Sequence, residues 1–140
     1  MKSKTLFSIL IIFLISSYSY ADNVPAIVKK SFESRFPNAK NVKWDKENGS
    51  EYEAAFKLKG IKYSTTFSST GDWMETESPT TFEMLPISVQ NTFNDSNKGV
   101  KPRLCSKIEL STGRIKYEIE IKKKKKTIEL FYEEDGKQIK

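Results

Sequence analysis

The residue types that most often carry out catalysis or bind metals are scarce in this chain of 140 residues. It contains no histidine and one cysteine, Cys105. Histidine is the commonest general base and the commonest metal ligand, so a nucleophile here would lack its usual partner. Arg103 and Lys107 lie two residues from Cys105 on either side, but without a histidine we favour a structural or incidental thiol. We therefore expect no catalytic residue and no enzyme.

Carboxylates are numerous but do not form a recognisable ligand motif. Acidic residues cluster at two turns, residues 45–47 and 133–135, without the spacing of a calcium loop. No glycine-rich phosphate loop, metal-type cysteine pattern or nucleophile elbow occurs. The remaining carboxylates are scattered along expected strands, which is typical of solvent-facing positions. We expect no cofactor and no metal.

The densest charge feature is a run of five lysines, Lys122, Lys123, Lys124, Lys125 and Lys126. Five ammonium groups could contact anionic lipid, glycan or an acidic protein surface. A solvated hairpin tip, offset by glutamates on neighbouring strands, is the simpler interpretation and the one favoured here. The formal net charge of +6 comes from mixed signs along the chain and does not favour nucleic acid as a partner.

Aromatic residues make up 12% of the chain, which is enough to build a binding surface or a core. On the uncovered face of a sheet they would form a patch rich in hot-spot residues. Facing helices they would form core, which we favour for the tyrosines. Trp73, beside a turn, is expected to be the exposed one. The candidate partner-binding residues are Trp44, Tyr63, Trp73, Lys123, Lys124 and Lys125.

The first 21 residues have the composition of a secretory leader. Lys2 and Lys4 precede an apolar run over residues 6–15, and Ser19 and Ala21 have signal-peptidase spacing. The run is shorter than the roughly 20 residues of a spanning helix. We expect cleavage after Ala21 and export to the periplasm or beyond, with an uncleaved anchor as the alternative.

The remaining chain nearly repeats itself. Residues 24–32 (VPAIVKKSF) return as residues 85–93 (LPISVQNTF), and residues 52–57 (YEAAFK) return as 117–122 (YEIEIK). A repeat of this length indicates two copies of one supersecondary unit. We place the copies at residues 22–78 and 79–140, packed into one compact domain.

Each copy is predicted to be a helix followed by an antiparallel meander. Apolar residues recur every four positions from Val24, so the first helix should have Pro25 at its first position and end before Pro37. Alternation then predicts strands, the fourth a short one at residues 73–77, and residues 78–81 as the joint between copies. The second helix is expected at about residues 86–94. The fold class is α+β, with both helices on one face of a curved sheet of six to eight strands.

Four motifs carry a resemblance to a known family. They are the V/L-P-x-x-V-x-x-x-F helix start, the Y-E-x-x-x-K strand, a turn with an aromatic residue four positions before glycine (Phe67 with Gly71, Tyr132 with Gly136), and FPNAKNVKW over residues 36–44. Together they resemble the PepSY-like, β-lactamase-inhibitor-like family, small exported two-repeat proteins common in Bacteroidota. The match spans the chain after the leader. The second copy lacks the FPNAKNVKW segment.

The resemblance implies a fold, and it carries over no catalytic residue because fold does not fix function. Our hypothesis is a non-enzymatic exported module, inhibitor-like, that binds another envelope or secreted protein through the uncovered sheet face. That hypothesis predicts a contiguous aromatic patch on this face. The alternative is an envelope-surface or sensor protein that contacts anionic lipid or glycan through the lysine run.

Overall fold

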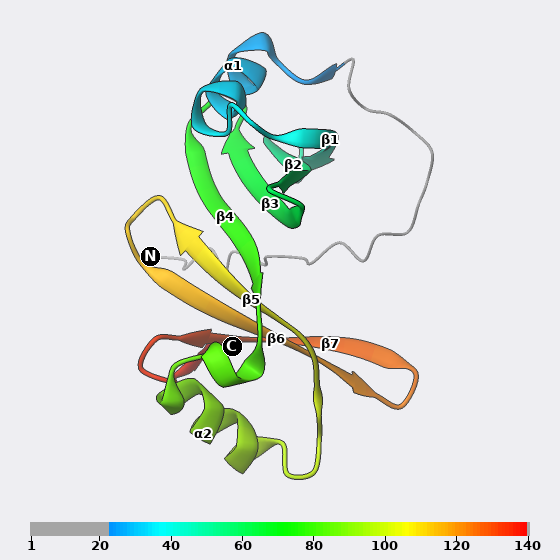
Figure 1. Cartoon of the computed structure of the whole chain (residues 1–140), viewed down its shortest axis with the longest axis vertical. Helices are drawn as coiled ribbons and strands as arrows, with labels where there is room; N and C mark the ends of the chain where they lie inside the picture. The colour runs from blue at the N-terminus through cyan, green and yellow to red at the C-terminus, as the bar shows by residue number, and fades with distance from the viewer. Residues whose placement is uncertain (1–22, 140) are drawn as a thin grey trace.

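The computed structural model describes residues 23–139, so the predicted leader lies outside the described residues (Figure 1). Two helices and a short 3-10 turn accompany one open sheet of eight antiparallel strands, which lie in sequence order. The expected combination of helices with an antiparallel sheet is confirmed. The elements are α1 (Ala26–Arg35), β1 (Lys40–Glu47), β2 (Glu51–Leu58), β3 (Ile61–Ser68), β4 (Trp73–Thr80), η2 (Phe82–Met84), α2 (Ile87–Ser96), β5 (Pro102–Leu110), β6 (Ile115–Lys123), β7 (Lys126–Glu133) and β8 (Gln138–Ile139).

A proline precedes each helix as its N-cap, whereas the sequence predicted that it would be the first helical residue. Pro25 has φ −55° and ψ 142°, so it is the N-cap of α1 instead of its first helical residue, and its carbonyl accepts the Val28 and Lys29 amides. Pro86 stands in the same relation to α2. The fixed φ of proline suits this place, and a proline here removes no intrahelical hydrogen bond.

The prediction that residues 78–81 form a joint between the copies is wrong, because most of them are part of a strand. Ser78, Pro79 and Thr80 belong to β4, which pairs with β5 through Lys107, Ser106 and Cys105. The strand expected at residues 73–77 is therefore eight residues long. Its last residues become strand because each pairs with a residue of β5, and the local sequence does not predict this long-range pairing. This pairing makes one continuous sheet of the two halves of the chain.

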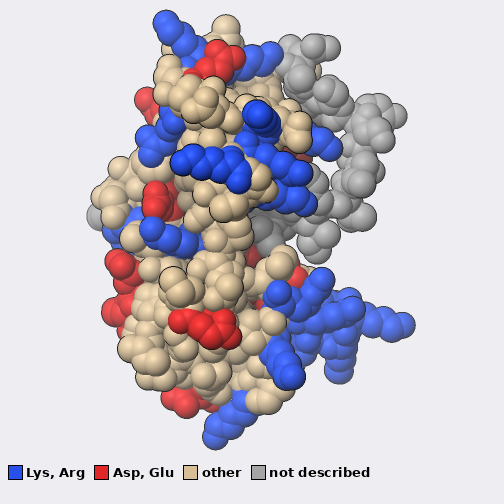
Figure 2. Space-filling view, in the orientation of Figure 1, with Lys and Arg blue, Asp and Glu red and all other residues tan. Residues whose placement is uncertain are grey.

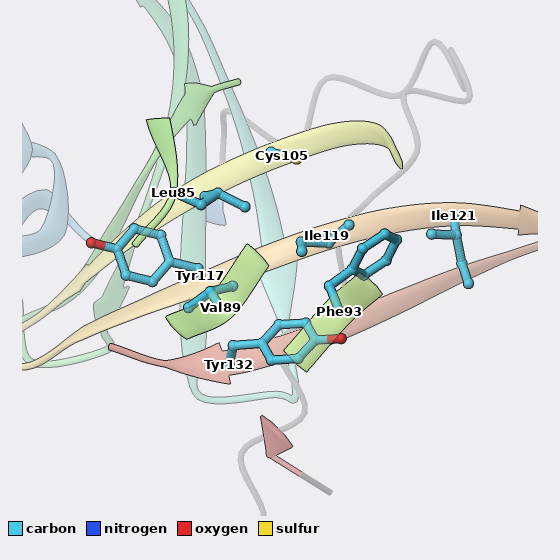
Figure 3. Packing of buried hydrophobic residues seen from close by; sticks show 8 residues of the cluster. All are labelled: Leu85, Val89, Phe93, Cys105, Tyr117, Ile119, Ile121 and Tyr132. Atoms are coloured by element: carbon cyan, nitrogen blue, oxygen red, sulfur yellow. The ribbon is translucent and has the colours of Figure 1, made fainter. Parts of the chain in front are cut away.

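Each half has its own hydrophobic core, and its own helix lies over it. In the first half, Val28 and Phe32 of α1 pack on strand residues that include Phe56 and Phe67. In the second half, the core under α2 contains Leu85, Val89, Phe93, Cys105, Tyr117, Ile119, Ile121 and Tyr132 (Figure 3). Apolar residues at every second strand position supply both cores, as the sequence alternation predicts.

Strand register places both helices on the same face of the sheet. Side chains alternate between faces along a strand, and directly paired residues share a face. Thr65 shares its strand face with Phe67, which lies beneath α1, and it pairs with Thr76 of β4. Thr76 in turn pairs with Glu109 of β5. Glu109 shares its strand face with Cys105, which lies in the core under α2. We call the opposite side the open face. Its central positions are Glu53, Ser64, Thr66, Glu75, Glu77, Ser106, Ile108, Lys116, Glu118, Glu120, Glu129 and Phe131.

Candidate functional site

The three aromatic candidates lie on the helix side of the sheet. Trp44 packs edge-on against Phe32, with ring centroids 5.2 Å apart, and Tyr63 stacks on Phe56 at 5.7 Å. Both are partly buried against the first-half core. Sequence alternation contained the signal for this placement, because both share their strand face with core residues. The predicted aromatic patch on the open face is therefore wrong, and Phe131 is the one aromatic that the described strands place there.

Trp73 is held between a cation and a hydroxyl. The Arg35 guanidinium carbon lies 3.5 Å from its ring centroid, and its indole N–H donates to Thr76 Oγ1 at 2.9 Å. A hollow of about 440 Å³ adjoins it, lined also by Ile27 and Ser31 of α1. The stacked cation and the satisfied indole hold Trp73 in place as part of the packing between α1 and β4.

The lysine run forms the tip of the β6–β7 hairpin. Lys123 pairs with Lys126, and Lys124 takes φ 57° in the turn between them. All five side chains are exposed. In Figure 2 basic side chains project from the body of the molecule where Figure 1 shows this tip. The structure thus places Lys123, Lys124 and Lys125 together, far along the sheet from the aromatic candidates.

The open face carries a diagonal row of carboxylates that sequence reasoning missed. Glu53 of β2, Glu77 of β4 and Glu118 of β6 point to this face from alternate strands. Serines occupy the strands between: the Ser64 hydroxyl hydrogen-bonds Glu53, and the Ser106 hydroxyl hydrogen-bonds Glu77. We call Glu53, Glu77 and Glu118 the acidic row. Its members are far apart in sequence, and only the strand order of the folded sheet brings them together.

Glu118 is the most unusual member of the acidic row. Its side chain is 2% exposed, and neither carboxylate oxygen has a hydrogen-bond partner among the described residues. Burial first, and then the charges of Glu77, Glu129 and Glu120, raise its pKa to about 9 against the opposing effect of Lys116. A buried carboxylate without partners is costly, so the group is protonated and neutral at pH 7.

The other two carboxyls of the row are perturbed in the same direction. Burial, followed by the charge of Glu47, raises the pKa of Glu53 to about 7. The pKa of Glu77 is raised by burial and by Glu75, while its hydrogen bond from Ser106 opposes the shift. Titratable groups with raised pKa values, gathered on one surface, mark a candidate functional site.

Acidic residues beside the row already have cationic partners. Arg103 Nη1 lies 3.2 Å from Glu120 Oε1, and Lys116 Nζ lies 3.7 Å from Glu75 Oε2. The described part of the chain supplies no ion pair to Glu53, Glu77 or Glu118. The acidic row thus has no ion-pair contact of this kind, although the charge of Lys116 acts on Glu77 and Glu118.

The Cys105 thiol is not suited to nucleophilic chemistry. It is buried in the core under α2 (Figure 3), and burial raises its pKa to about 11, with Glu83 and Glu118 adding to the shift. A nucleophile must be a thiolate, and this thiol stays protonated. Residues 23–139 hold no group of three or more His, Cys, Asp or Glu arranged to bind a metal ion. None of the helices in the described range has the length and apolarity to cross a membrane.

The fold defines a class of protein known from solved structures of Bacteroides. A DUF2874 family protein of Bacteroides ovatus aligns with a TM-score of 0.70 and 22% identity, covering 83% of this chain and 84% of that one. A protein of Bacteroides eggerthii described as one of the "putative periplasmic proteins" gives 0.74 and 16%, over 84% and 86%. A BLIP-like protein of Bacteroides fragilis gives 0.64 and 19%, over 83% of each chain. These likenesses show a shared fold.

The chain belongs to the family described as "Putative beta-lactamase-inhibitor-like, PepSY-like", which matches residues 17–62 and 50–140. The resemblance carried by the helix, strand and turn motifs is thus confirmed. No curated protein matches the chain. The family has an inhibitor-like description, and of the three structural neighbours the one from Bacteroides eggerthii is described as periplasmic.

Proposed function

We propose that this protein is a non-catalytic, exported binding module that docks another envelope or secreted protein on its open face, in the manner of an inhibitor. Family membership and the fold shared with a BLIP-like protein support an inhibitor-like role. The absence of a thiolate nucleophile at Cys105 agrees with a role that involves no covalent catalysis.

One observation carries the proposal: both helices lie on one side of the sheet, and the other side holds an unpartnered buried carboxyl group, Glu118. Native proteins satisfy nearly all buried polar groups, so an exception needs an explanation. A partner that supplies donors to the open face would provide one.

Steric blocking tests the use of the open face. Thr66→Trp places a bulky ring among its central residues, while Asn91→Trp on the exposed surface of α2 is the matched control. We expect the unmodified chain and Asn91→Trp to capture the same protein from a periplasmic extract of the native host, and Thr66→Trp to lose it. Circular dichroism would verify that both variants fold. Equal capture by all three chains would contradict the proposal.

We also propose that the chain is a duplicated unit preceded by a cleaved leader. Each half begins with a proline-capped helix, continues with four strands and has its own core, which supports a duplication; because β4 continues to Thr80, we place the boundary after this residue instead of after residue 78. For the leader, mass spectrometry of the exported protein should give a chain that begins at Asp22. A chain that keeps residues 1–21 would indicate an anchor instead.

The projecting lysine tip favours a second candidate function, contact with an anionic surface. Five exposed ammonium groups at one hairpin end could attract anionic lipid or glycan. Vesicles of phosphatidylglycerol should then co-sediment with the chain, those of phosphatidylcholine should not, and replacement of all five lysines by serine should abolish binding. Co-sedimentation that the replacement leaves unchanged would remove this candidate.

A further inference from the structure

We infer that the open face receives a lysine- or arginine-bearing segment of the partner protein, with the acidic row of Glu53, Glu77 and Glu118 contacting its cationic side chains. This inference rests on the proposed function and deepens it, since it assigns the chemistry of the partner.

The first argument is the excess of carboxyl groups over cations around the acidic row. Lys116 and Arg103 form ion pairs with Glu75 and Glu120 on the same face, and Lys116 only partly opposes the raised pKa values of Glu77 and Glu118. A surface of one sign selects a partner surface of the other sign, because like charges facing each other across an interface cost several kcal/mol. An acidic row that Lys116 offsets only in part therefore selects a basic segment.

The second argument is the buried Glu118 carboxyl. It has a donor from neither backbone nor side chain, although the carboxyls of Glu53 and Glu77 have serine donors. A lysine ammonium has three donors at the end of a flexible four-carbon stem, so it can reach a recessed carboxylate from a backbone held at the surface. It would supply both the charge and the hydrogen bonds that the site lacks.

The third argument is spacing. Members of the row lie on alternate strands, and each step also moves two residues along the strands, so successive carboxyls are separated by roughly 12 Å along the diagonal. Alternate residues of an extended segment lie about 7 Å apart on one side. Lysine or arginine stems can bridge the difference, so an extended basic segment fits the row better than a single cation.

Binding of such a segment should release protons. The groups that face Glu118 are Glu77 from β4, Ser106 from β5, Lys116 and Glu120 from β6, and Glu129 and Phe131 from β7. Three of these six groups are acidic, and together with burial they keep the carboxyl protonated when no ligand is present. A bound ammonium favours the ionised form, so the carboxyl proton passes to solvent and affinity rises as pH increases.

Calorimetry with a synthetic probe tests the inference. The probe is a nine-residue peptide of alternating Lys and Thr, its counterpart has Glu in place of Lys, and the protein is the chain from residue 22 onward. We expect the Lys peptide to bind with an affinity that rises between pH 6 and pH 9, with proton release seen as a dependence on buffer ionisation enthalpy. Equal binding of the Glu peptide, or no binding of either, would overturn the inference.

Two glutamine variants separate the acidic row from general surface charge. Glu118→Gln keeps the shape of the neutral carboxyl, and Glu109→Gln removes an exposed carboxylate on the helix side, where it pairs with Lys107. Loss of a buried partner should weaken peptide binding by at least roughly tenfold and remove proton release in the first variant, while the second behaves as wild type. Equal affinities for both variants would contradict the assignment.

Two outcomes distinguish this inference from its foundation. If the protein captured on the open face is lost with Thr66→Trp but retained when all three glutamates of the row become glutamine, the docking surface stands and its proposed chemistry is wrong. If the chain self-associates in sedimentation experiments, and serine replacement of the five tip lysines abolishes this, then the occupant is a second copy and the assigned partner is wrong.

Discussion

At the scale of single residues, the informative groups are those that the fold holds in an unfavourable state. Glu118 is buried and neutral on a strand whose other face forms the core with Tyr117 and Ile119. A residue selected only for stability would be apolar here, because replacing a buried polar group by a well-packed apolar one is often neutral or stabilising. Its retention is understandable if the carboxyl is used.

The burial of Glu118 predicts an unusual dependence of stability on pH. Its pKa in the folded state, about 9, lies above the ordinary value of 4.5, so its contribution is complete below about pH 4.5 and is lost as pH rises toward 9. Glu118→Gln should therefore stabilise the protein by roughly 2–3 kcal/mol at pH 7 and have little effect at pH 4. Urea unfolding at the two pH values measures this, and equal destabilisation at both would contradict it.

Cys105 allows a simpler prediction. Its thiol is buried and its pKa lies near 11, so at pH 8 the thiolate fraction is roughly a hundredfold below that of an ordinary cysteine. A chromogenic disulfide reagent should react with the native protein at least that much more slowly than with the protein in urea. Rapid reaction in the native state would show that the thiol is accessible.

At the scale of elements, the glycine of each aromatic turn contacts a helix. Gly71 has φ +88°, and a Cβ there would lie 2.9 Å from Ser31 Oγ and 3.1 Å from the Ile27 carbonyl oxygen. At Gly136, with φ +87°, a Cβ would lie 2.6 Å from the Ser88 carbonyl oxygen. The turn after each third strand thus approaches the start of its helix closely enough to exclude any side chain.

These contacts rank the expected effects of alanine. Gly136→Ala meets backbone atoms of α2, which cannot move aside, and should cost several kcal/mol of unfolding free energy. Gly71→Ala meets a serine hydroxyl first and should cost less. Gly113→Ala is the matched control, since its φ is +80° and nothing lies within 4 Å, so it reports backbone strain alone. Thermal unfolding would establish the order, and equal losses at all three would refute it.

Local patterns predicted most of the elements and missed what long-range pairing decides. The strand of Tyr52, Ala54 and Phe56 and the helix of Val28 and Phe32 follow from periods of two and four, and both are confirmed. The end of α1 is also as predicted, because Pro37 cannot follow a helical residue. The last residues of β4 have no strong pattern of their own and become strand only through β5.

At the scale of the whole molecule, two separate cores share one sheet. Both tryptophans, Trp44 and Trp73, lie in the first half, so their fluorescence reports on that half alone. Six residue pairs between β4 and β5 join the halves without a gap. The molecule should therefore unfold as one cooperative unit, even though its apolar residues are divided.

A substitution in the second core tests this cooperation. Phe93→Ala removes a fully buried ring beneath α2 and should lower the unfolding free energy by about 3–5 kcal/mol. If the halves cooperate, tryptophan fluorescence and far-UV circular dichroism will shift to the same lower denaturant midpoint. Fluorescence that keeps the wild-type midpoint while circular dichroism shifts would show that the halves unfold independently.

The candidate site lies beyond what single-sequence reasoning could predict. Alternation assigns Glu53, Glu77 and Glu118 to the face opposite the core, but it leaves them looking like ordinary solvent-facing residues. Their convergence requires the strand order, and their lack of an ion-pair contact requires knowing that Lys116 and Arg103 pair with Glu75 and Glu120. For the aromatic candidates the error was the opposite one. Their residue type suggested a binding surface, but their alternating strand positions place them beside the core.

The two outermost strands of the open sheet have features that oppose aggregation through their unpaired edges. β1 carries exposed Lys40, Lys43 and Lys46 and a bulge where Asn41 takes φ 56°, and β8 is two residues long. Charges, a local kink and brevity are the means by which proteins stop unpaired strand edges from adding to those of other molecules. A sheet of this width is thereby protected from fibrillar aggregation through its edges.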